Sequence, residues 1–427
     1  MKNKVLIIFI TLMVVSSSLF AAYNYPQLFY PNTTYKPISA RVEAMGGAGL
    51  ATASGGDALF INPANLSSKK FSLNLPSVTV TLFNPFKILE SDLIEDLQDM
   101  EDFDMEDPAE MLAFANKVSN IFGFDKGEVL TTDLAVSFTA GGFGLGINVQ
   151  EQLHTSNNVG DALSLKLIAE VNAALTLGYG YRFNIVPKVF SIDAGVSVRF
   201  AYKAYTNRVG ISDAIGLFMN DDEDADILGS LMSGVQLAAG WALPIDVGVN
   251  FNLPVGFRVS AVARDINGKY TMQNYPEMGM WVNDLYEFIG LEPEYVATTS
   301  DESVELIHEV PWKLDLGVAW APSFGKVDKF VKPTIAVDLV DTITMFEKVG
   351  DNPDAFWNYF RAGAEVRLLS VLDVRAGFNQ GYFSVGVGLD LFAIKLDASY
   401  YWREFGKEIG DKPVDALTVR VNLGFDR

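Results

Sequence analysis

The residues of this chain that could do chemistry are mostly charged, because nucleophilic and metal-binding side chains are scarce. The 427 residues include two histidines, His154 and His308, and no cysteine. A zinc or thiol site needs clustered ligands, so no metal centre is predicted, and no Gly-x-Ser-x-Gly sequence indicates a serine nucleophile. Residues 99–107 could offer carboxylate oxygens to calcium, although without the spacing of an EF-hand. We therefore expect no catalytic residue and no cofactor.

Charged residues also recur at alternate positions of the strands that are predicted below. The polar face of those strands carries six acids: Asp193, Asp315, Asp338, Glu365, Asp373 and Asp397. The same face carries nine bases: Arg199, Arg258, Arg264, Lys313, Arg361, Arg367, Arg375, Lys395 and Arg420. Most of these groups should pair across strands, since an unpaired buried charge is costly. Five of the bases are also candidates for attracting the carboxylate of a ligand: Arg199, Arg258, Arg361, Arg375 and Arg420.

These side chains lie on short segments in which apolar and polar residues alternate. In 190–200 and 417–425 every second residue is apolar, and the residues between them are polar or small. Successive side chains of a strand point to opposite faces. The pattern predicts fourteen strands, near 71–83, 131–139, 143–150, 165–182, 189–203, 238–252, 256–265, 312–321, 333–341, 358–369, 372–379, 382–390, 393–403 and 416–425. One apolar face per strand fits a soluble sandwich or a membrane barrel.

The lengths of the connections favour the barrel. The longest ones, 84–130, 204–237 and 266–311, follow odd-numbered strands, as does the shorter 151–164. Connections after even-numbered strands are mostly short turns, and outer-membrane barrels have long loops on one rim and short turns on the other. Pro244 indicates a bulge in segment 238–252, which we keep as one strand. The predicted fold class is therefore all-β, a 14-stranded antiparallel transmembrane barrel.

Composition agrees with a membrane barrel. Residues 1–22 have the basic start, apolar run and small-residue exit of a signal peptide, and no later run of about 20 apolar residues predicts a transmembrane helix. The chain is nevertheless 49% hydrophobic and 12% aromatic, with a formal charge of -21. Membrane strands reconcile these values, because they spread their apolar residues over alternate positions. The acidic balance argues against nucleic acid as a partner.

Two of the long connections carry apolar residues at helical spacing. Asp107-Pro108 reads as an N-cap followed by proline at the first helical position. An apolar pattern then follows at Met111, Phe114, Ala115, Val118, Ile121 and Phe122. A second pattern comprises Trp281, Leu285, Phe288 and Ile289. Such helices could pack over the mouth of the barrel or only on each other, and the function of the acidic stretch 90–110 stays open.

The stretch 41–65 differs from everything that follows it. It is rich in Gly and Ala, nearly free of charge, and has neither helical nor strand periodicity. Gly46, Gly47 and Gly49 permit backbone angles closed to other residues and close approach to a wall. Asn62-Pro63 predicts a rigid turn, because proline fixes its own φ and biases the preceding residue toward extended backbone. The stretch cannot build its own core and must be held by the strands.

Met45-Gly-Gly-Ala-Gly49, Asp57-Ala58 and Asn62-Pro63-Ala64 resemble the N-terminal plug of FadL-type long-chain fatty-acid transporters. The match is closest to the divergent branch that includes spirochaetal FadL-like and PorV-like barrels. The resemblance implies a plug over residues 23–70, inside a 14-stranded barrel over 71–427 with helical insertions in its extracellular loops. It also implies a gate around Arg41, Gly46, Gly47, Gly49, Asp57, Asn62, Pro63 and Ala64. Gly144 and Gly146 are compatible with the kink that the family has in its third strand.

The resemblance implies transport of long-chain fatty acids or similar hydrophobic molecules across the outer membrane, by ligand capture and plug-gated passage. We expect contact with outer-membrane lipid and a monomeric barrel. The alternative is a PorV-like barrel that serves a protein secretion or surface-attachment system as a partner. A general diffusion porin or a purely structural barrel is a third interpretation, against which the plug argues. The sequence indicates no particular ligand pocket.

Overall fold

A computed structural model describes residues 35, 37–93, 95, 107–123, 125–158, 160–187, 189–206, 209–210, 227–406 and 409–426. Within these ranges one antiparallel sheet contains eighteen strands. They are β1 Ser72–Phe83, β2 Asp125–Ala140, β3 Phe143–Asn158, β4 Asp161–Val186, β5 Phe190–Thr206, β6 Val209–Gly210, β7 Leu237–Ala242, β8 Ile245–Asn252, β9 Phe257–Ile266, β10 Lys269–Tyr275, β11 Val304–Glu309, β12 Lys313–Trp320, β13 Val331–Leu339, β14 Phe360–Leu368, β15 Leu372–Asn379, β16 Tyr382–Leu391, β17 Ile394–Glu404 and β18 Pro413–Asp426. The predicted signal peptide and most of the acidic stretch 90–110 lie outside the described residues.

The sheet closes into a ring, because β1 pairs with β2 on one side and with β18 on the other. Four pairs of consecutive strands each continue one position of the ring, namely β5 with β6, β7 with β8, β9 with β10 and β11 with β12. The eighteen strands therefore occupy fourteen positions, which confirms the predicted barrel. A closed ring leaves no strand edge unpaired, as a barrel in lipid requires.

Burial along the strands distinguishes the barrel from a sandwich. In β5, Val196, Val198 and Phe200 are exposed, whereas the intervening Ser197 and Arg199 are buried. The same exposed apolar positions recur around the ring, at Leu134, Val136, Ile147, Leu175, Leu177, Val247, Val318, Val337, Val385, Val419 and Val421. A soluble sandwich would bury these residues in its core. An apolar exterior around a polar interior suits a barrel that faces lipid.

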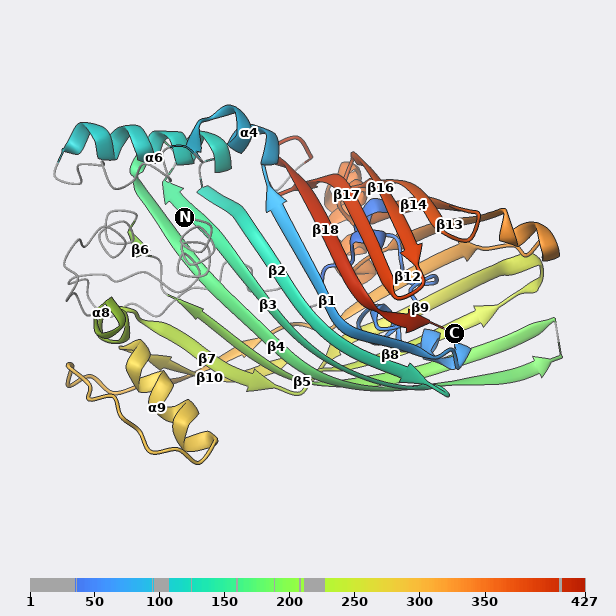
Figure 1. Ribbon diagram of the computed structural model, residues 1–427, viewed down its shortest axis with the longest axis horizontal. Helices are drawn as coiled ribbons and strands as arrows, with labels where there is room; N and C mark the ends of the chain where they lie inside the picture. The colour runs from blue at the N-terminus through green and yellow to red at the C-terminus, as the bar shows by residue number, and fades with distance from the viewer. Residues whose placement is uncertain are drawn as a thin grey trace.

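The two rims of the barrel differ. One rim, called the helical rim here, carries α4 Pro85–Glu90, α6 Pro108–Phe122, α8 Ile227–Gly234, α9 Met278–Phe288, α10 Thr342–Asp351 and α11 Phe356–Tyr359. Figure 1 shows α4, α6, α8 and α9 gathered at one end of the molecule. The other rim, the short-turn rim, has the connections between β2 and β3, β4 and β5, β8 and β9, β14 and β15, and β16 and β17. No helix in the described ranges is long and apolar enough to cross a membrane.

Several strands are longer than predicted on the side of the helical rim. The predicted connection 151–164 is wrong, because β3 extends to Asn158 and β4 begins at Asp161. The predicted connection 266–311 is likewise shortened by β10 and β11. Alternation fails here because residues 153–157 are buried whichever face they point to. One covering element is α6, whose Met111, Phe114 and Val118 form a buried cluster with Leu165 of β4.

Pro244 interrupts its strand without shifting its position in the ring. Segment 238–252 is divided into β7 and β8, and both pair with β5. Proline has no backbone N–H to donate to the ladder, but its carbonyl still accepts a hydrogen bond of 3.0 Å from the backbone N of Arg199. Keeping the segment as one strand position is therefore correct, while its hydrogen-bond ladder is broken at the proline.

The segment 37–69 lies inside the ring, as the blue ribbon in Figure 1 shows. It contains α2 Ala40–Ala44, α3 Asp57–Ile61 and the 3-10 helix η1 Pro63–Ser68. Its apolar side chains, many of them Ala, form small clusters. One contains Ala58, Leu59, Phe60 and Leu66, one joins Val42, Leu50, Ala53 and Ile61 to Val262 of β9, and one joins Met45, Ala48 and Ala51 to Ala319 of β12 and Ala336 of β13. We call residues 37–69 the plug from here on.

Candidate functional site: the plug and the cavity beside it

The turn Asn62–Pro63–Ala64 contacts the barrel wall through Asn62, which is 0% exposed. The side-chain oxygen of Asn62 accepts a hydrogen bond of 3.0 Å from the backbone N of Ala64, which fixes the turn locally. Its Nδ2 donates to the carbonyl of Leu50 at 3.0 Å and to Oδ1 of Asn250 on β8 at 2.8 Å. One side chain thus ties the turn to itself, to the rest of the plug and to the wall.

Glycines of the wall make room for this turn. A Cβ on Gly195 of β5 would overlap the carbonyl group of Pro63, and one on Gly248 of β8 would overlap Oδ1 of Asn62. Both glycines sit at inward positions, where a side chain would occupy the space that the plug fills. The contact between Pro63 and the wall is therefore a backbone contact that no larger wall residue permits.

The glycines at the start of the plug serve the same close approach from the other side. Gly46 has φ +66, and a Cβ there would overlap the backbone of Phe378 on β15. Gly47 has φ +81, also a conformation that favours glycine. The backbone N of Gly49 and that of Leu50 both donate to Oδ2 of Asp338 on β13, at 2.7 and 2.8 Å. The predicted glycine positions are thus where plug backbone meets wall.

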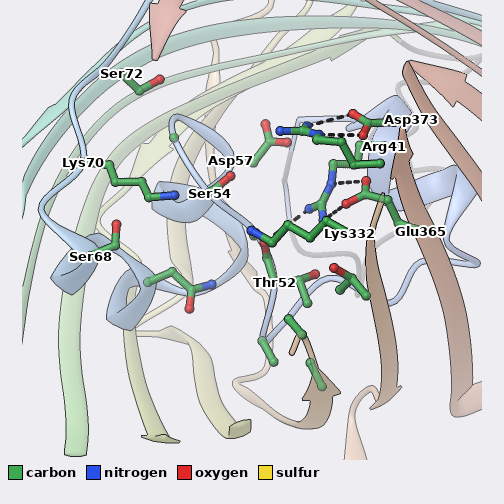
Figure 2. Close-up of a pocket in the computed structure, with 18 of the residues that line it drawn as sticks. Arg41, Thr52, Ser54, Asp57, Ser68, Lys70, Ser72, Lys332, Glu365 and Asp373 are labelled. Carbon is green, nitrogen blue, oxygen red and sulfur yellow. Dashed lines mark hydrogen bonds and ion pairs between the residues drawn. The ribbon is translucent and has the colours of Figure 1, made fainter. Parts of the chain in front are cut away.

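Arg41 forms a two-point ion pair between plug and wall. Its Nε lies 2.8 Å from Oε2 of Glu365 on β14, and its Nη2 lies 3.0 Å from Oε1 (Figure 2). Two parallel N–H···O bonds of this kind are the strong geometry for a guanidinium and a carboxylate. Glu365 also accepts from Arg375 at 2.7 Å, and Arg375 contacts Asp373 and Asp397 at 2.9 and 2.5 Å. Arg41 therefore joins a continuous network of charges on the wall.

Asp57 anchors the plug at a second point. It accepts from Arg420 of β18 at 2.9 Å and from the hydroxyl of Ser39 at 2.7 Å. Burial favours the protonated form of Asp57, but the charge of Arg420, the hydrogen bonds from Ser39 and Arg420, and the charge of Arg41 outweigh it. The pKa of Asp57 therefore lies below its usual value of 3.8. The carboxylate stays charged, and the anchor with it, at neutral pH.

The five bases proposed for a ligand carboxylate fall into two groups. Arg199 pairs with Asp246 at 3.0 Å and with Asp265, and Arg375 and Arg420 pair as described above. Arg258 donates instead to Oδ1 of Asn252 at 2.7 Å and to the carbonyl of Ala51 at 2.8 Å. Arg361 donates to the carbonyls of Asn358 and Phe360. Among the described residues, neither Arg258 nor Arg361 has a carboxylate within ion-pair distance.

A cavity of about 600 Å³ lies between the plug and the short-turn rim, and we call it the inner cavity. The plug lines it from Ala51 to Asp57, and the wall lines it with residues near the ends of β4, β8, β12, β14, β16 and β18. Its cations are Arg41, Lys70, Arg182, Arg258, Lys332, Arg367, Arg375, Lys395 and Arg420, and its acids are Asp57, Glu365, Asp373, Asp390 and Asp397. The cavity brings together Arg258, Arg375 and Arg420, but not Arg199 or Arg361.

Two further wall residues hold the plug: Arg264, one of the charged groups of the predicted polar face, and Asn250, which the sequence did not single out. Arg264 of β9 pairs with Asp315 and donates to the carbonyls of Phe60, at 2.8 Å, and Ile61. Asn250 accepts from Asn62 and donates to Asn65 at 2.9 Å. Glycines at inward positions of the predicted strands were the available signal, because they recur where charged or polar residues would otherwise stand.

The structure changes the interpretation of the two histidines and of two glycines of β3. His154 and His308, which fall in the predicted connections 151–164 and 266–311, lie in β3 and β11. The pairings of β3 run through Gly144 and Gly146 without a shift of register. A Cβ at either position would come close to Leu59 of the plug, so these glycines also make room for the plug. Within the described residues, no three His, Asp or Glu side chains are placed to hold a metal ion.

No protein-family model matches the sequence, and no curated protein matches it. Among solved structures, the toluene transporter TodX of Pseudomonas putida is similar over 92% of this chain and 99% of its own, with a TM-score of 0.44 and 11% identity. A FadL homologue of Pseudomonas aeruginosa is similar over 91% and 98%, with a TM-score of 0.42 and 10% identity. The chain resembles FadL-type barrels.

CymD, described as a monoaromatic hydrocarbon channel, is similar over 91% of this chain and 96% of its own, with a TM-score of 0.45 and 11% identity. The likeness to these FadL-type barrels spans nearly the whole of each chain. The closed strand ladder and the apolar exterior described above define the fold of this chain.

Proposed function

We propose that this barrel transports hydrophobic molecules across the outer membrane, with long-chain fatty acids as the ligand class, and that the plug gates their passage. The observation that best supports this proposal is how the plug is held. Hydrogen bonds and ion pairs fasten it to the wall, and its own apolar clusters are small. Polar contacts of this kind can break and re-form in a wet lumen without exposing a large apolar core.

The residues of the gate have different parts in this proposal. Arg41 and Asp57 act as latches, because each holds a charged partner on the wall. Gly46, Gly47 and Gly49 allow the plug backbone to approach the strands. Asn62–Pro63–Ala64 is the stiff turn that transmits movement between η1 and the segment around Leu50, since the Asn62 side chain binds both.

Capture of the ligand is proposed to begin at the helical rim. The end of α9 and the residues after it expose several large apolar side chains, with Phe288 83% and Val296 82% exposed. Ile289 and Leu291, between them, are also exposed. Large apolar side chains that are exposed within one connection favour contact with a hydrophobic ligand, because leaving them in water costs free energy. A hydrocarbon chain would lower that cost by covering it.

Arg361 is the proposed contact for the ligand carboxylate on the way to the plug. Its side chain lies against Gly47, and its hydrogen bonds go to backbone carbonyls rather than to a carboxylate. A guanidinium with no carboxylate within ion-pair distance gains most from an arriving anion. Arg199, Arg375 and Arg420 are already paired, so we assign them to holding the barrel and plug together.

The test is binding of radiolabelled oleate to the refolded protein in detergent, with an unrelated refolded barrel as the control. We expect saturable binding that is weakened when Phe288 and Val296 are both replaced by Ser. Replacing Phe324 and Val327, which are exposed in the connection between β12 and β13, by Ser is the matched control and should leave binding unchanged. No binding above the control barrel would overturn the proposal. Co-purification with a large secreted protein in that case would support the PorV-like alternative.

A further inference from the structure

The inner cavity contains more positive charge than its carboxylates neutralise. Six of its nine cations have a carboxylate partner within 4.0 Å: Arg41, Arg182, Arg367, Arg375, Lys395 and Arg420. The partner of Arg182 is Asp193, bound at 2.6 Å. Lys70, Arg258 and Lys332 have no carboxylate at that distance among the described residues. Three cations therefore face one cavity without an ionic partner.

Lys332 is the clearest of the three. It lies directly across the ladder from Arg367, as the pairing of β13 with β14 shows. Like charges directly opposite each other on one face of a sheet are destabilising. Arg367 donates from Nε and Nη2 to the two carboxylate oxygens of Asp373, at 2.7 and 2.8 Å. Asp373 also binds Arg375, and the described residues include no ion pair between Asp373 and Lys332.

Lys70 reaches the same cavity from another direction. It follows the plug and precedes β1, and Figure 2 shows its side chain and that of Lys332 extending toward the cavity from opposite sides. Both ammonium groups are on exposed side chains. Two flexible lysines can therefore close on one bound group, each offering three N–H donors.

We propose that the inner cavity is an anion-binding site, in which Lys70, Lys332 and Arg258 hold a carboxylate or phosphate group. The volume of about 600 Å³ is typical of a small-molecule site. Its wall is formed by charged and amide side chains with few large apolar ones, so it fits a hydrated anion or an anionic head group rather than a hydrocarbon chain. An anion here balances the excess charge and separates Lys332 from Arg367.

The anion can come from two sources, which share the same chemistry. One is a free anion such as inorganic phosphate. The other is the head group of an amphiphile that has passed the plug, and only this second source rests on the proposed transport of fatty acids. A site for a free anion does not depend on transport. An experiment that uses both a free anion and an amphiphile therefore separates the two proposals.

The test is protection of lysines from acetylation in the full-length protein in detergent, measured by peptide mass spectrometry. Inorganic phosphate, laurate and uncharged dodecanol are the probes, at constant ionic strength set with potassium chloride. At about ten times the Kd of a bound anion, modification of Lys70 and Lys332 should slow about tenfold. Lys348, exposed on α10 at the helical rim, is the control and should react at an unchanged rate.

The outcomes separate the sources. Protection by phosphate and laurate at similar concentrations indicates a site for any such anion, and protection by laurate at far lower concentrations indicates an amphiphile head group. Dodecanol should not protect. In Lys332→Gln, phosphate should no longer protect Lys70, while heat-modifiable mobility on a gel reports that the barrel is folded. Equal rates of lysine acetylation with and without both anions, or equal protection by dodecanol, would overturn the proposal of an anion-binding site.

Discussion

Arg41 in the plug and Glu365 on β14 form a two-point ion pair, with N–O distances of 2.8 and 3.0 Å across 324 residues of sequence. The pair joins the segment that was expected to gate the barrel to the charge network of the wall. Because Glu365 also binds Arg375, the position of the plug and the charge balance of the inner cavity depend on the same carboxylate.

Replacing Arg41 by Gln should loosen the plug without unfolding the barrel. Removing one partner of a largely buried ion pair costs about 3–5 kcal/mol, and here that cost falls on docking of the plug rather than on the strand ladder. We expect faster release of a small hydrophilic dye from proteoliposomes. Arg182→Gln, which breaks a pair within the wall, is the matched control. Equal dye release from both variants would contradict a latch at Arg41.

Adding a methyl group to the wall should displace the turn at Pro63. In Gly195→Ala the new Cβ would overlap the backbone of Pro63 and Ala64, which cannot rotate away as a side chain could. We expect a folded but leaky barrel, measured by gel mobility and dye release. Gly350→Ala is the control, because its Cβ meets no atom within 4 Å. A tight barrel in the Gly195→Ala variant would mean that the turn does not press on β5.

The Asp57–Arg420 anchor gives a specific dependence on pH. The folded pKa of Asp57 lies below 3.8, so its contribution is fully present above that pH and is lost as the pH falls through the lowered pKa. The difference in dye release between the wild type and Asp57→Asn should therefore be constant from pH 7 to about 4 and shrink below it. A difference that already shrinks between pH 7 and 5 would show that Asp57 is protonated more easily than its contacts with Arg420 and Ser39 allow.

Pro63→Gly should loosen the gate more than it weakens the barrel. Proline restricts the unfolded chain, and replacing it by Gly costs roughly 0.4–1 kcal/mol through that entropy. The loss falls on the turn, whose hydrogen bonds to Leu50 and Asn250 depend on the orientation of Asn62. We expect increased dye release at unchanged heat-modifiable mobility. A lowered unfolding temperature of the whole barrel with no increase in release would argue for a structural role of the turn.

The strands of the barrel wall could be predicted because the alternation that marks them involves residues that are neighbours in the sequence. The alternation of apolar and polar residues in β5 and β18 indicates which side chains face lipid. The lengths of the connections indicate which strand ends lie at the helical rim and which at the short-turn rim. The prediction fails where that signal ends. Beyond about residue 150, β3 is covered on both faces. Residues such as His154 therefore no longer alternate with apolar neighbours, and a polar segment without alternation resembles a loop in the sequence.

The contacts of the plug could not be predicted because they depend on how the ring closes. Nothing near Arg41 in the sequence indicates Glu365, and nothing near Asn62 indicates Asn250, since these pairs are set by the register of distant strands. Gly144 and Gly195 gave a usable hint. A glycine at an inward position of a strand in a polar lumen leaves a space, and in this fold the plug occupies it.

Deleting residues 40–66 tests the central claim, that a separable plug closes a self-sufficient barrel, most directly. The ring closes through β1, β2 and β18 without using any plug residue in its ladder. The deleted protein should therefore keep the heat-modifiable band of a folded barrel and take up a small hydrophilic dye that the full-length barrel excludes. Loss of the folded band would contradict the account, because it would make residues 40–66 a core element on which the strands depend rather than a gate.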